Sequence, residues 1–212
     1  MRSRVIEEYK KNLFLTLRQK QILIGLLLGD AHLENQYRSG MGRLKIEHSY
    51  KQKDYVDWLY GEFRGWVRTS PRKRERLSWG KPQNKYGFTT YGHKLLGKFR
   101  DLFYNRDGRK IVPKNIESYL TPLSLAIWFM DDGSIKSVRH KGMFLNTQAF
   151  RVLEVKRLQK ALKKKFLIET IVRKDKSGFQ IYILGKSADN FMKLIRPRII
   201  PSMEYKIPRL LR

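Results

Sequence analysis

Two apolar segments of similar pattern decide the fold: Leu23–Ala31 reads LIGLLLGDA and Leu125–Gly133 reads LAIWFMDDG. Because a helix that is apolar on all sides lies in the interior of a protein, both segments predict buried helices. The first helix is predicted to begin at Thr16, where Gln19 completes a capping box, and the second at Thr121. Each helix ends in aspartate, which is the unfavourable charge for the C-terminal end of the helix dipole. This repeated arrangement points to a function of the aspartates rather than to helix stability.

The segments that follow the two helices recur in the same order. Each helix is followed by a predicted strand pair, a helix, a second strand pair and a further amphipathic helix. Each half then ends in a lysine shortly before a proline, at Lys110 and Lys206. The chain is thus predicted to have an α+β fold made of two pseudo-symmetric αββαββα subdomains. Each subdomain is expected to hold a four-stranded antiparallel sheet with helices on one of its faces.

The repeat also predicts how the chain is divided. We expect a basic N-terminal extension in residues 1–15, a first subdomain in residues 16–120 and a second subdomain in residues 121–212. A subdomain duplicated within one chain is the single-chain version of a symmetric dimer. The sequence therefore predicts a monomer with an internal pseudo-two-fold axis.

The composition indicates the class of partner. The 212 residues include 46 Lys and Arg against 19 Asp and Glu, which gives a formal net charge of +27. Such an excess, on a chain that is 41% hydrophobic and so able to fill a core, favours binding to nucleic-acid phosphates. The absence of cysteine excludes disulfides and cysteine-based zinc sites, and the apolar stretches are too short to span a membrane. We expect no membrane partner. The sequence leaves the compartment open and favours the cell interior, either a bacterial or archaeal cytoplasm or an organelle matrix.

Asp30 and Asp132 are the candidate metal ligands. If the two apolar helices pack against each other, these carboxylates emerge side by side and repel unless cations bridge them. Hard oxygen ligands suit Mg²⁺, which lowers the pKa of a bound water and offsets the charge that develops on a scissile phosphate. Lys110 and Lys206 are candidates for stabilising that charge or for ordering water. The plain alternative is that the aspartates only end packed helices and that the lysines are two solvated charges among many.

The two motif copies, with their matched strands and lysines, resemble the LAGLIDADG homing endonucleases over about Thr16 to Pro208, in particular the monomeric, two-motif, intron-encoded members. The resemblance implies a site-specific double-strand DNA endonuclease that leaves short 3′ overhangs and promotes intron mobility. It also implies that the two sheets form a DNA-binding saddle over a long double-stranded site. Mg²⁺ is the expected cofactor, Mn²⁺ is expected to substitute, and Ca²⁺ is expected to support binding without turnover.

The resemblance also implies roles for individual residues. The backbone carbonyls of Gly29 and Asp131 are expected to assist metal binding, whereas the Asp131 side chain is not. The strand residue that orders active-site water in the family falls on Gln148, and its counterpart in the first half is Ser49, which makes the two sites chemically unequal. The implied catalytic residues are Asp30, Asp132, Lys110, Lys206 and Gln148.

Strand alternation predicts which side chains face DNA, since successive side chains of a strand point to opposite faces. In the first half, Leu33, Leu44, Ile46, Leu77 and Trp79 are expected to turn inward. Outward arginine and lysine favour guanine, and glutamine and asparagine favour adenine. The predicted DNA-contacting residues are His32, Glu34, Gln36, Arg38, Arg43, Lys45, Glu47, Arg72, Arg74, Arg76, Ser78, Ser134, Lys136, Asn146, Gln180 and Tyr182.

Two other functions are open from the sequence. An RNA-binding maturase on the same scaffold would assist splicing of its host intron, so host intron RNA is a possible second partner. A regulator of the same fold would bind DNA without cutting it. The presence of both Asp30 and Asp132 argues against pure binding, because carboxylates without a cation repel phosphates.

Overall fold

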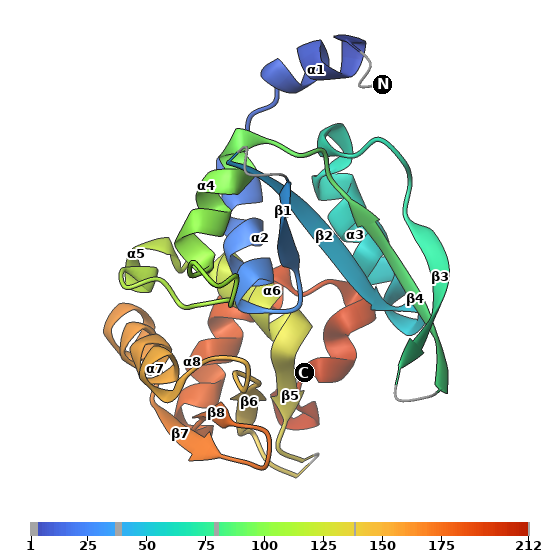
Figure 1. Cartoon of the computed structure of the whole chain (residues 1–212). Coiled ribbons are helices and arrows are strands. Elements are labelled where there is room, and N and C mark those ends of the chain that lie inside the picture. Colours follow the sequence, from blue (N-terminus) through green and yellow to red (C-terminus); the bar gives the residue numbers. More distant parts are fainter. Residues whose placement is uncertain (1–3, 37–39, 79–80, 138, 212) are drawn as a thin grey trace. The chain divides into compact units, whose positions relative to one another are not determined.

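The computed structural model of the chain describes residues 4–36, 40–78, 81–137 and 139–211. It contains two compact units, each of which combines a sheet with helices (Figure 1). Their bounds are Met1–Lys20 with Asp30–Leu102 for unit 1, and Gln21–Gly29 with Phe103–Arg212 for unit 2. The predicted subdomain boundaries follow the sequence repeat instead, and they stay a prediction. Among the helices of the described ranges, none is both long and apolar enough to cross a membrane.

Unit 1 is built on an antiparallel sheet with the strand order β1-β2-β4-β3. Helix α3 (Lys53–Glu62) packs on one face of this sheet, against β2 and β4 (Figure 1). Helix α4 (Lys94–Phe103) follows the interior strand β4, and α1 (Arg4–Lys11) lies in the predicted N-terminal extension. The strands are β1 (His32–Gln36), β2 (Met41–Ser49), β3 (Arg72–Ser78) and β4 (Lys81–Thr89).

Unit 2 repeats this plan with the strand order β5-β6-β8-β7. Helix α7 (Val152–Phe166) packs against β7 and β8, and the short α5 (Ile116–Tyr119) packs against α7. Helix α8 (Gly185–Ile195) packs against α6 (Pro122–Asp132). The strands are β5 (Gly133–Ile135), β6 (Met143–Leu145), β7 (Thr170–Lys174) and β8 (Phe179–Ile183). The predicted fold class, with two four-stranded antiparallel sheets and helices, is confirmed.

Both motif helices begin where the sequence predicts. At the start of α2 (Leu17–Leu28), the Gln19 N–H donates to the Thr16 hydroxyl at 3.1 Å, and the Thr16 N–H donates to the Gln19 side chain at 3.0 Å. At the start of α6, Thr121 and Ser124 form the same reciprocal pair. These bonds satisfy N–H groups that have no partner inside the helix.

The two motif segments pack closely within unit 2. A Cβ atom at Gly25 would lie 2.5 Å from the Cβ of Ile127 and from the backbone oxygen of Ser124, and one at Gly29 would collide with Asp131. Gly25 and Ile127 occupy the same position of the two motif copies, as do Gly29 and Asp131. Each glycine of the first copy therefore makes room for the larger residue of the second.

Two details of the predicted strands differ from the structure. Leu77 was expected to be covered, but it is 80% exposed, so this end of the β3–β4 hairpin lacks a packed layer over it. Trp79, its predicted inward neighbour, lies outside the described residues. The strand pair predicted after the second motif helix has strands of only three residues each, β5 and β6, and single backbone bonds from Lys136 to Gly142 and from Asn146 to Asp132 extend the pairing at its two ends.

Candidate active site and nucleic-acid interface

Asp30 lies in the turn between α2, which ends at Leu28, and β1, the first strand of unit 1. Its side chain is 50% exposed, and its Oδ2 lies 3.6 Å from Nδ1 of His48 on β2. His48 is buried and packs edge-to-face against Tyr55 of α3, with ring centroids 5.2 Å apart. Packing thus fixes the imidazole beside the first motif carboxylate.

Sequence reasoning missed His48, although the strand pattern contained the information. Leu44, Ile46 and His48 alternate along β2, and all three are buried. A histidine in step with two buried aliphatic residues belongs to the inner face. His48 is the last inward-facing residue of β2, and β2 pairs with β1, the strand that follows the first motif. The alternation could therefore have placed the imidazole near Asp30.

The second motif copy places a threonine where the first places His48. The registers of β1 with β2 and of β5 with β6 make Thr147 the counterpart of His48. Thr147 is fully buried, and its hydroxyl donates to the backbone oxygen of Phe179 at 2.7 Å. The backbone oxygen of Asp132 accepts from the backbone N–H of Asn146 at 3.0 Å. In place of an imidazole, the second copy therefore has a hydroxyl group that is already hydrogen-bonded to Phe179.

Gln148, predicted to order water, is held by the turn between β7 and β8. Its side-chain amide donates to Oδ2 of Asp175 at 2.8 Å. This bond, with those from the backbone N–H groups of Ser177 and Gly178, holds the pKa of Asp175 below its ordinary value. The predicted counterpart, Ser49, is exposed at the end of β2 and accepts from the backbone N–H of Lys51.

Both predicted lysines lie against the C-terminal ends of the motif segments within unit 2. Lys110 Nζ donates to the backbone oxygen of Gly29 at 2.7 Å. Lys206 Nζ donates to the backbone oxygens of Met130 and, at 2.6 Å, of Asp131. The last carbonyls of a helix lack donors within the helix and carry the negative end of its dipole, so an ammonium group is favourable there. The lysines thus offset the helix ends where the motif aspartates stand.

The loop that presents Lys110 is anchored to α7 by an ion pair. Arg109 donates to the two carboxylate oxygens of Glu154 at 2.9 and 3.1 Å, and to the backbone oxygen of Lys110 at 3.1 Å. Burial alone would raise the pKa of Glu154, but the bonds from Arg109 and from the backbone of Arg151 hold it below its ordinary value. The pair therefore fixes the backbone next to the catalytic candidate.

The two consecutive aspartates at the end of α6 have different surroundings. Asp131 is 7% exposed and its side chain packs against Gly29, whereas Asp132 is half-buried. Asp30 belongs to unit 1 and Asp132 to unit 2. The predicted pairing of their carboxylates stays a prediction.

The donor set at the end of the first motif fits a divalent cation. A half-exposed carboxylate, Asp30, stands beside the imidazole of His48 and follows Gly29, whose backbone oxygen faces an ammonium group. Carboxylate, carbonyl and imidazole groups are ligands that Mg²⁺ or Mn²⁺ accepts. The residues present therefore suit a hard or borderline cation and not a thiophilic one.

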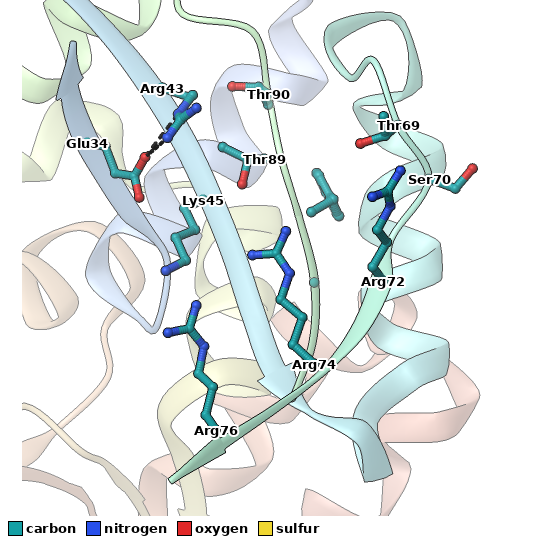
Figure 2. Close-up of a pocket in the computed structure, with 12 residues that line it drawn as sticks. Glu34, Arg43, Lys45, Thr69, Ser70, Arg72, Arg74, Arg76, Thr89 and Thr90 are labelled. Atoms are coloured by element: carbon teal, nitrogen blue, oxygen red, sulfur yellow. Dashed lines mark hydrogen bonds and ion pairs between the residues drawn. The ribbon is translucent and has the colours of Figure 1, made fainter. Parts of the chain in front are cut away.

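A groove of about 450 Å³ lies on the face of the unit 1 sheet that α3 does not cover (Figure 2). Its floor includes the small residues Gly87 and Thr89 of β4. The side chains that rise from β1, β2 and β3 are nearly all cationic, as a phosphate-binding surface requires. They are Glu34, Arg43, Lys45, Arg72, Arg74 and Arg76. These residues lie on the predicted outward face together with the exposed His32 and the half-exposed Glu47, and their contacts with DNA stay a prediction.

The corresponding face of the unit 2 sheet carries aromatic rings. Phe144 and Tyr182 lie with ring centroids 5.0 Å apart, and the Arg173 guanidinium lies 4.0 Å from the Tyr182 centroid. Gln180 donates to the Asn146 side chain at 3.1 Å. Tyr182 lies on the predicted face but is only 7% exposed, which corrects its expected accessibility, because its neighbours cover the ring. Sequence reasoning missed Phe144, which alternation from Asn146 could have found, and Arg173, which only the β7–β8 register places opposite Gln180.

The other predicted DNA-contacting residues divide into two groups. Ser134 and Lys136 are partly or fully exposed near β5, with Lys136 Nζ 6.0 Å from the Tyr182 ring centroid. Arg38 lies outside the described residues, as do the side chains of Gln36 and Ser78.

Comparison with known proteins gives consistent matches over nearly the whole chain. The sequence pattern of the LAGLIDADG DNA endonuclease family matches residues 20–191. The probable intron-encoded endonuclease 1 of Wickerhamomyces canadensis is 33% identical over 211 residues, which cover 97% of this chain and 90% of that protein. Cytochrome b mRNA maturase bI2 of Saccharomyces cerevisiae is 32% identical over 88% of this chain, which spans 46% of the maturase. The homing endonuclease I-WcaI, solved bound to its DNA recognition sequence, superposes with a TM-score of 0.91 at 32% identity, over 97% of this chain and 92% of that chain.

These matches show that the chain belongs to the LAGLIDADG DNA endonuclease family, as its two motif copies indicated. The protein is therefore a site-specific DNA endonuclease, a hydrolase whose partner is DNA.

Proposed function

We propose that the protein is a homing endonuclease that acts as a monomer, cuts both strands of one long DNA site and leaves short 3′ overhangs that promote intron mobility. The match to an intron-encoded endonuclease over most of both chains supports this role. Two sheets within one chain supply both halves of the DNA-binding surface. Because the groove of unit 1 is rich in arginine and the same face of unit 2 is rich in aromatic rings, the two half-sites differ in sequence. The target is then only weakly palindromic.

The proposed ligands of the divalent cation, Mg²⁺ in the first place, are the carboxylates of Asp30 and Asp132. The backbone oxygens of Gly29 and Asp131 are further ligands, since a carbonyl that accepts from lysine keeps a second lone pair. When bound, the cation lowers the pKa of the attacking water and offsets charge on the scissile phosphate. His48 positions the Asp30 carboxylate.

Lys110 and Lys206 stabilise the negative charge that builds on the phosphate. Their bonds to backbone oxygens keep each ammonium group at the end of a motif helix, so little reorganisation is needed during the reaction. Gln148 orders water through its side-chain oxygen, because its amide nitrogen already donates to Asp175. The observation that carries the proposal is the repeated arrangement of a motif aspartate beside a lysine-capped helix end.

Selection of cleaved sites from a randomised duplex library in Mg²⁺ tests this function and identifies the target sequence in the same experiment. The recovered sites should share one long, weakly palindromic sequence with short 3′ overhangs. Mn²⁺ should replace Mg²⁺, whereas Ca²⁺ should support binding without cleavage. Cutting that persists in excess EDTA, or a stable protein dimer on the DNA in sedimentation, would contradict the proposal.

A second candidate function is assistance to intron splicing. The observation that favours it is the 32% identity to a cytochrome b mRNA maturase, of which this chain spans 46%. A splicing assay with the host intron RNA tests it directly. If Asp30→Asn no longer cuts DNA but still increases the rate of splicing over that of the RNA alone, the two functions are separate.

A further inference from the structure

The sheet face of unit 1 that carries the groove holds two carboxylates among its cations, Glu34 in the groove and Glu47 on the same face of β2. Glu34 on β1 accepts from Nε and Nη2 of Arg43, at 2.9 and 2.5 Å, directly across the β1–β2 pair (Figure 2). Glu47 on β2 lies 3.1 Å from Nε of Arg76 on β3. On the intervening strand β4, Gly87 stands opposite Glu47 and Gln83 stands opposite Arg76, so this second pair crosses β4 diagonally. Two arginines of the groove are thus held by glutamates.

These glutamates do not increase affinity for DNA. On a surface that neutralises phosphates, each negative charge repels the backbone and reduces the number of counterions released. Lys45, Arg72 and Arg74 line the same groove, and none of them forms an ion pair with a carboxylate of the described residues. The groove therefore contains two kinds of cation. Those without an ion pair among the described residues suit general attraction of phosphates, whereas the arginines held by glutamates suit a different role.

Base recognition gives the paired groups a purpose. An arginine donates two bonds to the O6 and N7 atoms of guanine, and a glutamate accepts from the amino group of cytosine. An arginine already held by a carboxylate loses less conformational freedom when it meets a base. A Glu–Arg pair in a groove thus presents the donor and acceptor that a G·C base pair requires.

We propose that Glu34 and Glu47 are specificity-determining residues. Each glutamate, with Arg43 or Arg76, selects a G·C base pair in the half-site that unit 1 reads. Where thymine takes the place of cytosine, the carboxylate meets the O4 acceptor instead of an amino donor, which penalises binding there. The glutamates therefore lower affinity for all DNA and lower it most for the wrong sequence. This inference rests on the proposed function, because it requires a specific DNA site.

The experiment compares base preferences of the whole protein and three variants, E34Q, E47Q and the matched control E75Q. Glu75 is exposed, and its place in the alternation of β3 puts it on the opposite face of the sheet from Arg74 and Arg76. Each substitution removes one negative charge and keeps the side-chain shape. Preferences are read by selecting bound duplexes from a randomised library in Ca²⁺, and affinity is measured on a duplex of unrelated sequence.

The parental protein should require G·C at positions that E34Q and E47Q each relax, by about tenfold or more at one base pair. Both variants should also bind the unrelated duplex more tightly than the parent. E75Q should leave the base preferences of the parent intact. Unchanged preferences in both groove variants, or the same relaxation in E75Q, would overturn this inference alone. A parental protein that selects no sequence would overturn the proposed function and this inference with it.

Discussion

The first and second motif copies keep the same lysine contact but differ in what stands around the aspartate. In both copies a lysine donates to the backbone oxygen that precedes the motif aspartate, Gly29 in the first and Asp131 in the second. Beside this shared contact, His48 of the first half corresponds to Thr147 of the second. The glycines of the first copy correspond to larger residues of the second.

This difference shows that the two halves are not exact copies, because small residues of one half correspond to larger residues of the other. Gly25 leaves room for Ile127, and two residues of that larger size at both positions could not pack at the same distance. The sheets diverge as well, since β2 spans nine residues and its counterpart β6 spans three. The lysine contacts at the helix ends are thus shared, whereas the packing residues and the strand lengths differ between the halves.

The largest expected effect tests whether the two aspartates are equivalent despite these differences. Asp30→Asn and Asp132→Asn should each reduce cleavage of both strands by on the order of a hundredfold or more, because changes even outside the ligand shell of a metal cost about 10- to 100-fold. Binding should survive or tighten, since a negative charge near phosphate is removed. Nicking rates and affinity on the mapped site measure the two effects.

Asp131→Asn is the matched control for these variants. Its side chain points about 100° around the helix from that of Asp132 and packs against Gly29, so cleavage should fall less. A parental cleavage rate in Asp132→Asn, or a greater loss in Asp131→Asn, would show that the motif register is wrong.

The next effect tests the division of packing between the two copies. Gly25→Ala should destabilise the protein by about 1–3 kcal/mol, because its Cβ would meet Ile127 and the backbone oxygen of Ser124 at 2.5 Å. Gly61→Ala in α3 is the control, since a Cβ there has open space, and alanine favours a helix by up to about 1 kcal/mol. Denaturant unfolding should show opposite signs for the two variants. Equal stability of Gly25→Ala and the parent would contradict the packing described.

A smaller effect tests whether the imidazole makes the copies unequal. His48→Thr gives the first copy the residue of the second, and it should lower metal affinity and cleavage by about tenfold. Mn²⁺ binding followed by electron paramagnetic resonance measures the first quantity, and strand-specific nicking measures the second. Thr147→Ser, which keeps the hydroxyl bonded to Phe179, is the control and should change neither. Parental Mn²⁺ affinity in His48→Thr would remove His48 from the site.

The smallest effect concerns the ion pair that supports Lys110. Because the pKa of Glu154 is lowered in the folded state, its contribution is fully present above the ordinary value of 4.5 and is lost as pH falls through the folded pKa. Glu154→Gln should therefore lower the free energy of unfolding by about 1 kcal/mol at pH 7 and by less in acid. This figure allows for the partial exposure of Arg109, because solvent weakens the ion pair. Denaturant unfolding of the parent and of the variant, at pH 7 and at a pH below 4.5, measures the two differences in stability. Glu169→Gln, in the exposed pair with Lys163, should cost less at either pH.

Local rules predicted most of the fold and the ends of the motif helices. The capping boxes at Thr16 and Thr121 depend on residues three apart in the chain, so they are visible in the sequence. Burial that depends on distant segments was harder to predict: Leu77 follows the strand alternation, but its exposure depends on whether another element reaches that end of the hairpin. Tyr182 is covered by Arg173, whose position depends on strand pairing.

The candidate site divides in the same way. The motif aspartates and the lysines recur in the sequence, and the repeat itself reveals them. His48 has no repeat partner, because Thr147 occupies the equivalent position, so a search for repeated residues passes over it. The contacts of Lys110 with Gly29 and of Lys206 with Asp131 join segments far apart in the chain and required the structure.

Lys110 and Lys206 both reach for backbone oxygens, and this choice of partner affects how the protein can evolve. A backbone oxygen is present whatever side chain its residue carries, as glycine in one copy and aspartate in the other illustrate. Mutation of the partner residue therefore does not remove the lysine's anchor as long as the helix ends at the same place. After an ancestral gene duplication, the two halves could drift apart in sequence and acquire separate DNA targets without losing the placement of either ammonium group.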